Sequence, residues 1–82
     1  MAARLYGLTE EGLDRLLASD PFRALGADRA GMAEELLRTA LGGANRVPMR
    51  TARLRVEALI RALALEDGAG LREAVLDALV AR

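Results

Sequence analysis

Apolar residues recur along the chain at the three- and four-residue spacing that is typical of amphipathic helices. Residues that begin or end helices bound each run: Thr9, Asp20–Pro21 and Asp28 precede a run, and Gly26 and Gly42–Gly43 follow one. We therefore predict a helix in each of five segments, with Gly7 interrupting the chain before the first. These segments are approximately residues 10–18, 22–25, 28–41, 48–65 and 71–82.

Most of the predicted helices have a single apolar face, which we expect to line one common core. These faces consist of Leu13, Leu16 and Leu17; of Met32, Ala33, Leu36, Leu37 and Ala40; and of Leu71, Val75, Ala78 and Leu79. Phe22, the only phenylalanine, is expected in the same core. On the opposite side of the third helix, Glu34 and Glu35 lie four and three residues before Arg38, a spacing that favours ion pairs.

The predicted helix 48–65 differs from the others because it is apolar on two sides. Its expected core face consists of Met49, Ala52, Val56, Leu59, Ile60 and Leu63. A second stripe, nearly opposite, consists of Leu54, Ala58, Ala62 and Leu65. Two interpretations follow: the helix is the central helix of the bundle, or the second stripe is an exposed surface that binds a partner or a second copy of the chain.

The composition supports an all-helical fold. Alanine and leucine supply 33 of the 82 residues, whereas valine, isoleucine and threonine together supply eight. Side chains that favour helices thus far outnumber those that favour strands. We predict an all-α fold: a compact bundle of four main helices plus one short helix, forming a single domain over residues 1–82.

The residue inventory also excludes most kinds of catalytic and metal site. The chain has no cysteine and no histidine, so it lacks thiol nucleophiles, zinc thiolates and the usual general base. We therefore predict that it is not an enzyme, and we expect no cofactor, no metal and no small-molecule substrate. No apolar run approaches the ~20 residues of a membrane span, and no signal pattern opens the sequence, so we expect a soluble, cytoplasmic protein.

The charge balance is neutral overall but uneven along the chain. Residues 1–41 hold five arginines and seven acidic residues, residues 42–64 hold five arginines and one glutamate, and residues 65–82 hold two arginines and four acidic residues. The three net charges are therefore −2, +4 and −2. Within helix 48–65, the pairs Arg53–Glu57 and Glu57–Arg61 have the four-residue spacing of helical ion pairs.

Several stretches resemble acyl carrier proteins of the polyketide type. They are Asp-Pro-Phe-Arg-Ala-Leu-Gly-Ala-Asp at 20–28, Met-Ala-Glu-Glu-Leu-Leu at 32–37, Val47-Pro48 and Glu-Ala-Leu-Ile-Arg-Ala-Leu at 57–63, about half of the chain. Phe22, Leu25, Gly26, Asp28, Pro48 and Leu59 occupy places comparable to those of the family motifs. The family attaches phosphopantetheine to a serine after the aspartate, but here Arg29 and Ala30 follow Asp28. The resemblance therefore implies a four-helix fold without carrier activity.

These observations favour a non-catalytic helical interaction or adaptor module, which binds a protein partner or a second copy of itself. Its predicted binding residues form the second apolar stripe: Leu54, Ala58, Ala62 and Leu65. The alternative is a binder of nucleic acid or another polyanion, because a +4 segment suits phosphate contacts. The residues that would make those contacts are Arg46, Arg50, Arg53, Arg55 and Arg61.

Overall fold

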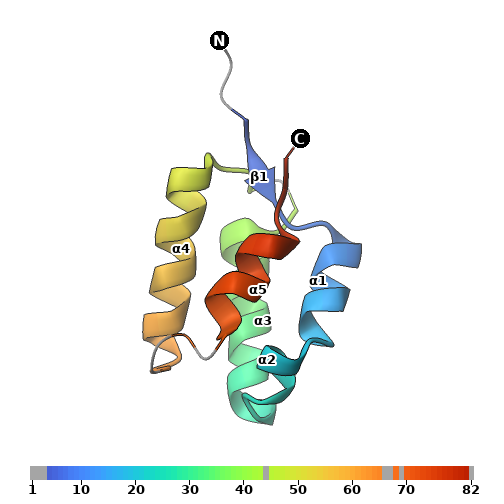
Figure 1. Ribbon diagram of the computed structural model, residues 1–82, viewed down its shortest axis with the longest axis vertical. Helices are drawn as coiled ribbons and strands as arrows, with labels where there is room; N and C mark the ends of the chain where they lie inside the picture. The colour runs from blue at the N-terminus through green and yellow to red at the C-terminus, as the bar shows by residue number, and fades with distance from the viewer. Residues whose placement is uncertain (1–3, 44, 66–67, 69, 82) are drawn as a thin grey trace.

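The computed structural model describes residues 4–43, 45–65, 68 and 70–81, and confirms the predicted all-α bundle. Its helices in chain order are α1 (Glu10–Leu17), α2 (Asp20–Arg23), α3 (Ala27–Leu41), α4 (Met49–Ala62) and α5 (Leu71–Ala78). Two short strands, β1 (Tyr6–Gly7) and β2 (Val80–Ala81), lie near the two ends of the chain. In Figure 1, α4 stands at one side of the bundle, α1 at the other, and α5 crosses in front of α3.

The first two helices begin close to where the sequence predicts. The hydroxyl of Thr9 accepts a hydrogen bond from the backbone N–H of Gly12 at 3.0 Å, which confirms the predicted cap of α1. Helix α2 comprises residues 20–23 rather than 22–25, and Ser19 is its N-cap. Proline has no backbone N–H, and Pro21 fits this position because N–H groups in the first turn of a helix make no hydrogen bond within the helix.

Helix α3 begins one residue earlier than predicted. Gly26, with φ of 85°, is its N-cap, so Asp28 lies in the first turn and is not the cap. A carboxylate in the first turn still favours the positive end of the helix dipole. At 15 residues α3 is longer than α4 at 14, whereas the sequence predicts that the fourth helix is the longest.

Helix α4 ends at Ala62, three residues before the predicted end. The backbone N–H of Ala64 bonds to the carbonyl of Arg61, and that of Leu65 bonds to the carbonyl of Ile60. This is the hydrogen-bond pattern of a Schellman motif, with Ala64 in the left-handed conformation at φ of 54°. The motif turns the chain away from the helix axis, so Leu65 no longer belongs to the helix.

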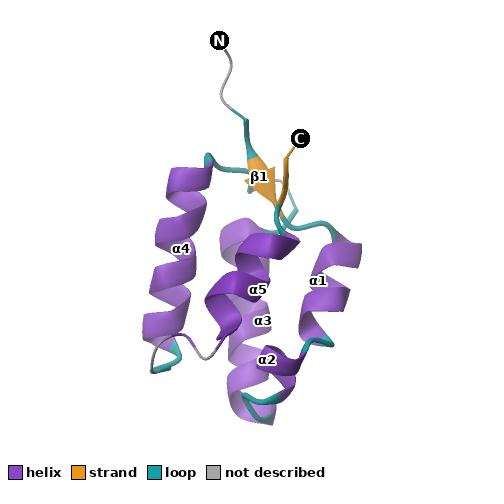
Figure 2. Ribbon diagram, viewed as in Figure 1, coloured by secondary structure: helices purple, strands orange, loops and turns teal. Residues whose placement is uncertain are grey.

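The two ends of the chain pair in a small sheet that the helical pattern does not predict. Helix α5 ends at Ala78 rather than continuing to the C-terminus, and β2 runs antiparallel to β1 with Gly7 opposite Val80. Strand β1 also contacts the loop between α3 and α4, because Tyr6 exchanges backbone hydrogen bonds with Val47 at 2.7 and 3.0 Å. Figure 2 shows this sheet at one end of the helical bundle. It holds both chain ends against the loop between α3 and α4.

The core lies between the helices and contains most of the predicted apolar positions. Phe22 is 1% exposed, as expected for the only phenylalanine. The predicted core face of α4 is buried except for Met49, which is half-buried. The other large buried side chains of the core are Leu8, Leu13, Leu16, Leu37, Leu41, Val47, Leu71, Val75 and Leu79.

Candidate functional site: an apolar groove between α3 and α4

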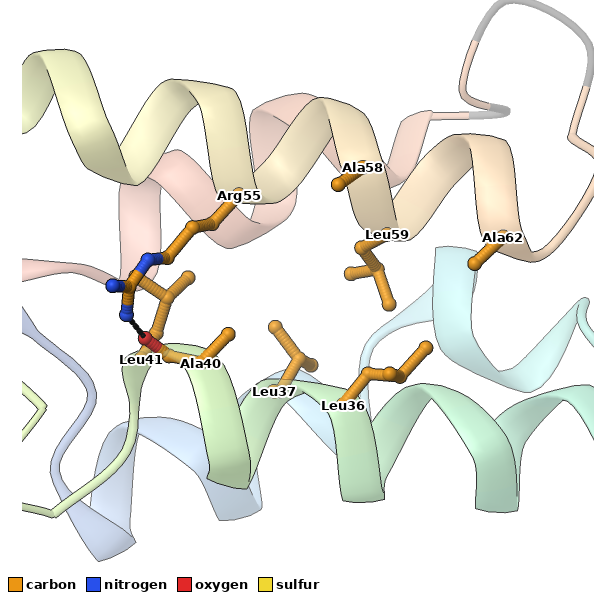
Figure 3. Close-up of a pocket in the computed structure, with 8 residues that line it drawn as sticks. All are labelled: Leu36, Leu37, Ala40, Leu41, Arg55, Ala58, Leu59 and Ala62. Atoms are coloured by element: carbon orange, nitrogen blue, oxygen red, sulfur yellow. Dashed lines mark hydrogen bonds between the residues drawn. The ribbon is translucent and has the colours of Figure 1, made fainter.

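Helices α3 and α4 lie side by side and run in opposite directions, and a groove of about 290 Å³ opens between them (Figure 3). Leu36 and Leu37 project into it from α3, while Leu59 projects towards them from α4. Seven of its eight lining residues are apolar. The full lining is Leu36, Leu37, Ala40, Leu41, Arg55, Ala58, Leu59 and Ala62.

The size of the side chains explains why the groove stays open. Leu37, Leu41 and Leu59 are at most 5% exposed and form its floor. Ala58 and Ala62 lie four residues apart on the outer side of α4 and are both exposed. Because a methyl group is too short to span the space to α3, these two alanines leave a hollow where leucines would close it.

Arg55 closes the end of the groove next to the C-terminus of α3. Its guanidinium crosses from α4 and donates a hydrogen bond to the backbone carbonyl of Ala40 (Figure 3). Carbonyls in the last turn of a helix have no partner within the helix and carry the negative end of its dipole, so a cation is favourable there. Arg55 is half-buried and serves as a helix-end contact rather than as part of an exposed ridge.

The second apolar stripe is exposed along α4. Leu54 is 67% exposed, and Ala58 and Ala62 are also exposed. Leu65, by contrast, lies beyond the helix and is half-buried. Of the two interpretations of this helix, the structure therefore agrees with the exposed surface: α4 lies at the edge of the bundle and not at its centre (Figure 1).

Helix α3 adds apolar surface to the same side of the molecule. Met32 is 50% exposed and Leu36 is 36% exposed, so the prediction that both belong to the core face is wrong. The buried strip of α3 is narrower and consists of Ala33, Leu37 and Leu41. Met32 precedes Leu36 by one helical turn and so lies on the same side of the helix. We call the exposed residues Met32, Leu36, Leu54, Ala58 and Ala62 the α3–α4 face.

The remaining arginines of the basic segment lie on the surface. Arg46, Arg50, Arg53 and Arg61 are exposed, and none makes a hydrogen bond or ion pair within the part of the chain that the structure describes. Arg50 lies four residues before Leu54 and Arg61 seven residues after it, which places both beside the apolar stripe. Arg53 lies three residues after Arg50 and four before Glu57, on the same edge of α4 as Arg50 but farther from Leu54.

Glu57 does not form the predicted ion pairs with Arg53 and Arg61. It binds Arg72 of α5 instead, and the hydrogen bonds from that guanidinium, opposed by partial burial, lower the pKa of the Glu57 carboxyl. The charges of Arg72 and Arg61 act in the same direction as the hydrogen bonds. The predicted pair of Glu34 with Arg38 is confirmed at 3.2 Å, and Arg38 also reaches Glu10 of α1 at 3.1 Å.

The lining of the groove is apolar except for one side chain. Arg55 is its only ionisable lining residue, so its lining contains no acid–base pair. Within the described residues, no three acidic side chains come together as a metal site would require, and no helix is long and apolar enough to cross a membrane. The chain matches no family model, no curated protein and no solved structure.

Proposed function

We propose that this chain is a non-catalytic helical module that binds another protein through the α3–α4 face. The observation that carries the proposal is the exposure of Leu54, Met32 and Leu36 beside an apolar groove. Large apolar side chains gathered on one side of a small domain are typical of surfaces that a partner covers. The sequence pattern of α4 supports the same conclusion, because the helical part of its second stripe, Leu54, Ala58 and Ala62, repeats at four-residue spacing over about two turns.

A larger partner is favoured over a symmetric dimer by the charges beside the face. One twofold dimer of this face packs α4 of one copy against α4 of the other. Arg50 and Arg61 of one copy would then meet the same arginines of the other, which costs free energy without a counter-charge. We therefore place the partner outside this chain, and self-association becomes a measurable alternative.

The proposal can be tested by selecting helical peptides from a display library for binding to the purified protein. We expect the selected peptides to shift the amide NMR signals of residues that line the groove. A charged Ala58→Asp substitution should weaken their binding about tenfold or more, since it places a carboxylate in an apolar interface. Ala27→Asp is the matched control, because Ala27 is also exposed but lies at the start of α3.

Two results would contradict this function. One is a library that yields no binder. The other is a set of binders that tolerate Ala58→Asp and shift signals elsewhere on the bundle. Sedimentation velocity on the protein alone addresses self-association: a dimer that Ala58→Asp dissociates would identify the partner as a second copy.

A second candidate function is binding of a nucleic acid or another polyanion. It is favoured by one observation: Arg46, Arg50, Arg53 and Arg61 are exposed without an ion pair in the described part of the chain. Arg55 is committed to the Ala40 carbonyl, so four arginines rather than five would serve. The only two aromatic residues are Tyr6 and the buried Phe22, so this surface offers no platform for base stacking.

Mobility-shift titrations with duplex and single-stranded oligonucleotides over a series of salt concentrations test this candidate. Phosphate binding by four arginines predicts an affinity that falls steeply with salt, and that falls further when Arg50 and Arg53 are replaced by glutamine. Binding that is absent at low salt eliminates it.

A further inference from the structure

We infer that the segment bound by the α3–α4 face is an amphipathic helix with acidic residues along one edge of its apolar side. This inference rests on the proposed function and specifies the partner of the same site. It combines two features of the surface, namely the shape of the groove and the position of the arginines beside it.

The shape of the groove suits a helix. Two antiparallel helices side by side leave a trough between them, and a third helix can lay its apolar side chains into such a trough at three- and four-residue spacing. The exposed methyl groups of Ala58 and Ala62 allow a close approach to α4. Arg55 bounds the trough at one end, where its guanidinium is held by the Ala40 carbonyl.

The charges beside the groove define which edge of the partner helix must be acidic. Arg50 and Arg61 lie on the outer side of α4, flanking Leu54, and both are exposed. Glu57, the only acidic residue of α4, forms its ion pair with Arg72, although its charge also interacts with that of Arg61. A carboxylate on the partner at the edge next to α4 would therefore find two arginines that form no ion pair in the described structure.

Neither α1 nor α5 of a second copy provides such a helix within the described residues. Its large exposed apolar side chains are Leu5, Met32, Leu36, Leu54 and Val80. Three of these belong to the α3–α4 face itself, and the other two, Leu5 and Val80, lie outside the helices. The acidic residues of α1 and α5 thus have no large exposed apolar neighbour on their own helix. Glu35 of α3 does lie beside Met32 and Leu36, but these residues belong to the face that the partner covers. We therefore assign the complementary helix to another protein, and a dimer detected by sedimentation velocity would overturn this assignment.

Three synthetic peptides can test the inference. They share one pattern of leucines at positions 1, 4 and 5 of each seven-residue repeat and differ only in the edge residues, which are glutamate, glutamine or lysine. Fluorescence anisotropy gives the dissociation constant of each peptide with the full chain. We expect the glutamate peptide to bind about tenfold more tightly than the lysine peptide, with the glutamine peptide between them.

A pair of double variants then locates the charge effect. Arg50→Gln with Arg61→Gln should bring the three peptides within about twofold of each other, because it removes both cations beside Leu54. Arg15→Gln with Arg23→Gln removes the same net charge from exposed positions on α1 and α2, away from the face, and should leave the preference for glutamate intact. Circular dichroism confirms that each variant is folded.

The outcomes separate this inference from the proposed function. Equal affinity of all three peptides, with signals still shifting in the groove, overturns the acidic partner and leaves protein binding in place. An equal loss of preference in both double variants also overturns it, because the effect would then come from net charge. Absence of binding by any of the three peptides, while library peptides bind in the groove, overturns it as well. Failure of the library selection itself counts against the proposed function.

Discussion

Arg72 of α5 donates hydrogen bonds to Glu57 of α4 from two nitrogens of its guanidinium. Its Nε donates to Oε2 of Glu57, and its Nη2 donates to Oε1 at 2.8 Å. This forked geometry is among the strong forms of a protein ion pair. Here it joins α4 to α5 through two residues that are 15 positions apart in sequence. It also determines the surface of α4, since Arg53 and Arg61 lose the partner that their spacing predicts.

This ion pair predicts a pH dependence of stability. The pKa of Glu57 is lowered in the folded state, so its contribution is present above the pKa of the unfolded chain and is lost as the pH falls through the folded value. We expect Glu57→Gln to lower the urea midpoint at pH 7, and we expect this difference to shrink as the pH falls through the folded-state pKa of Glu57, because the carboxylate is then protonated. Replacing the exposed Glu35 by glutamine is the control, and a difference that persists unchanged into acid would contradict the assignment.

The end of α4 predicts a stabilising substitution. Ala64 has φ of 54°, a left-handed conformation that costs an L-residue about 1 kcal/mol and that glycine adopts readily. Ala64→Gly should therefore raise the free energy of unfolding by about 0.5–1 kcal/mol, measured by urea denaturation. Ala62→Gly, inside the last turn of the same helix, should lower it by a similar amount. A loss of stability in the first variant would show that the Schellman motif does not form.

At Gly7, adding a methyl group is expected to lower the stability of the fold. A Cβ at this position would lie 3.1 Å from the backbone carbonyl oxygen of Leu41, which cannot easily move, and 3.4 Å from the side-chain Cγ of Arg46. Gly7→Ala should lower the free energy of unfolding by about 1–3 kcal/mol. Gly31 lies within α3 with nothing inside 4 Å of such a Cβ, so Gly31→Ala should stabilise the fold by ~1 kcal/mol. Equal thermal midpoints of the two variants would refute this close approach.

The α3–α4 face predicts a separation of binding from stability. Leu54 is 67% exposed, so Leu54→Gln should change the free energy of unfolding by no more than about 0.5 kcal/mol. The same variant should weaken the binding of a groove peptide severalfold. Leu59, on the same helix, is only 5% exposed. Leu59→Ala should therefore lower the free energy of unfolding by about 2–5 kcal/mol. A large loss of stability in Leu54→Gln would mean that this side chain belongs to the core.

Local patterns predicted the parts of the fold that depend on neighbours in sequence. The cap at Thr9, the ion pair of Glu34 with Arg38 and the burial of Val56 follow from spacings of three or four residues, which a helix converts directly into contacts. The pairing of β1 with β2 could not be predicted in this way. It joins residues more than 70 positions apart, and neither two-residue strand has a pattern of its own.

The sequence by itself determined that this protein is an all-α bundle and that α4 carries a second apolar stripe, because helical periodicity and composition are local properties. Only the tertiary structure decided that this stripe faces solvent at the edge of the bundle, that Met32 and Leu36 extend the exposed surface, and that Arg55 is tied to α3. The reason is physical. Burial depends on which helices stand beside each face, and the partner of a charged side chain depends on which helix reaches it, as Arg72 reaches Glu57.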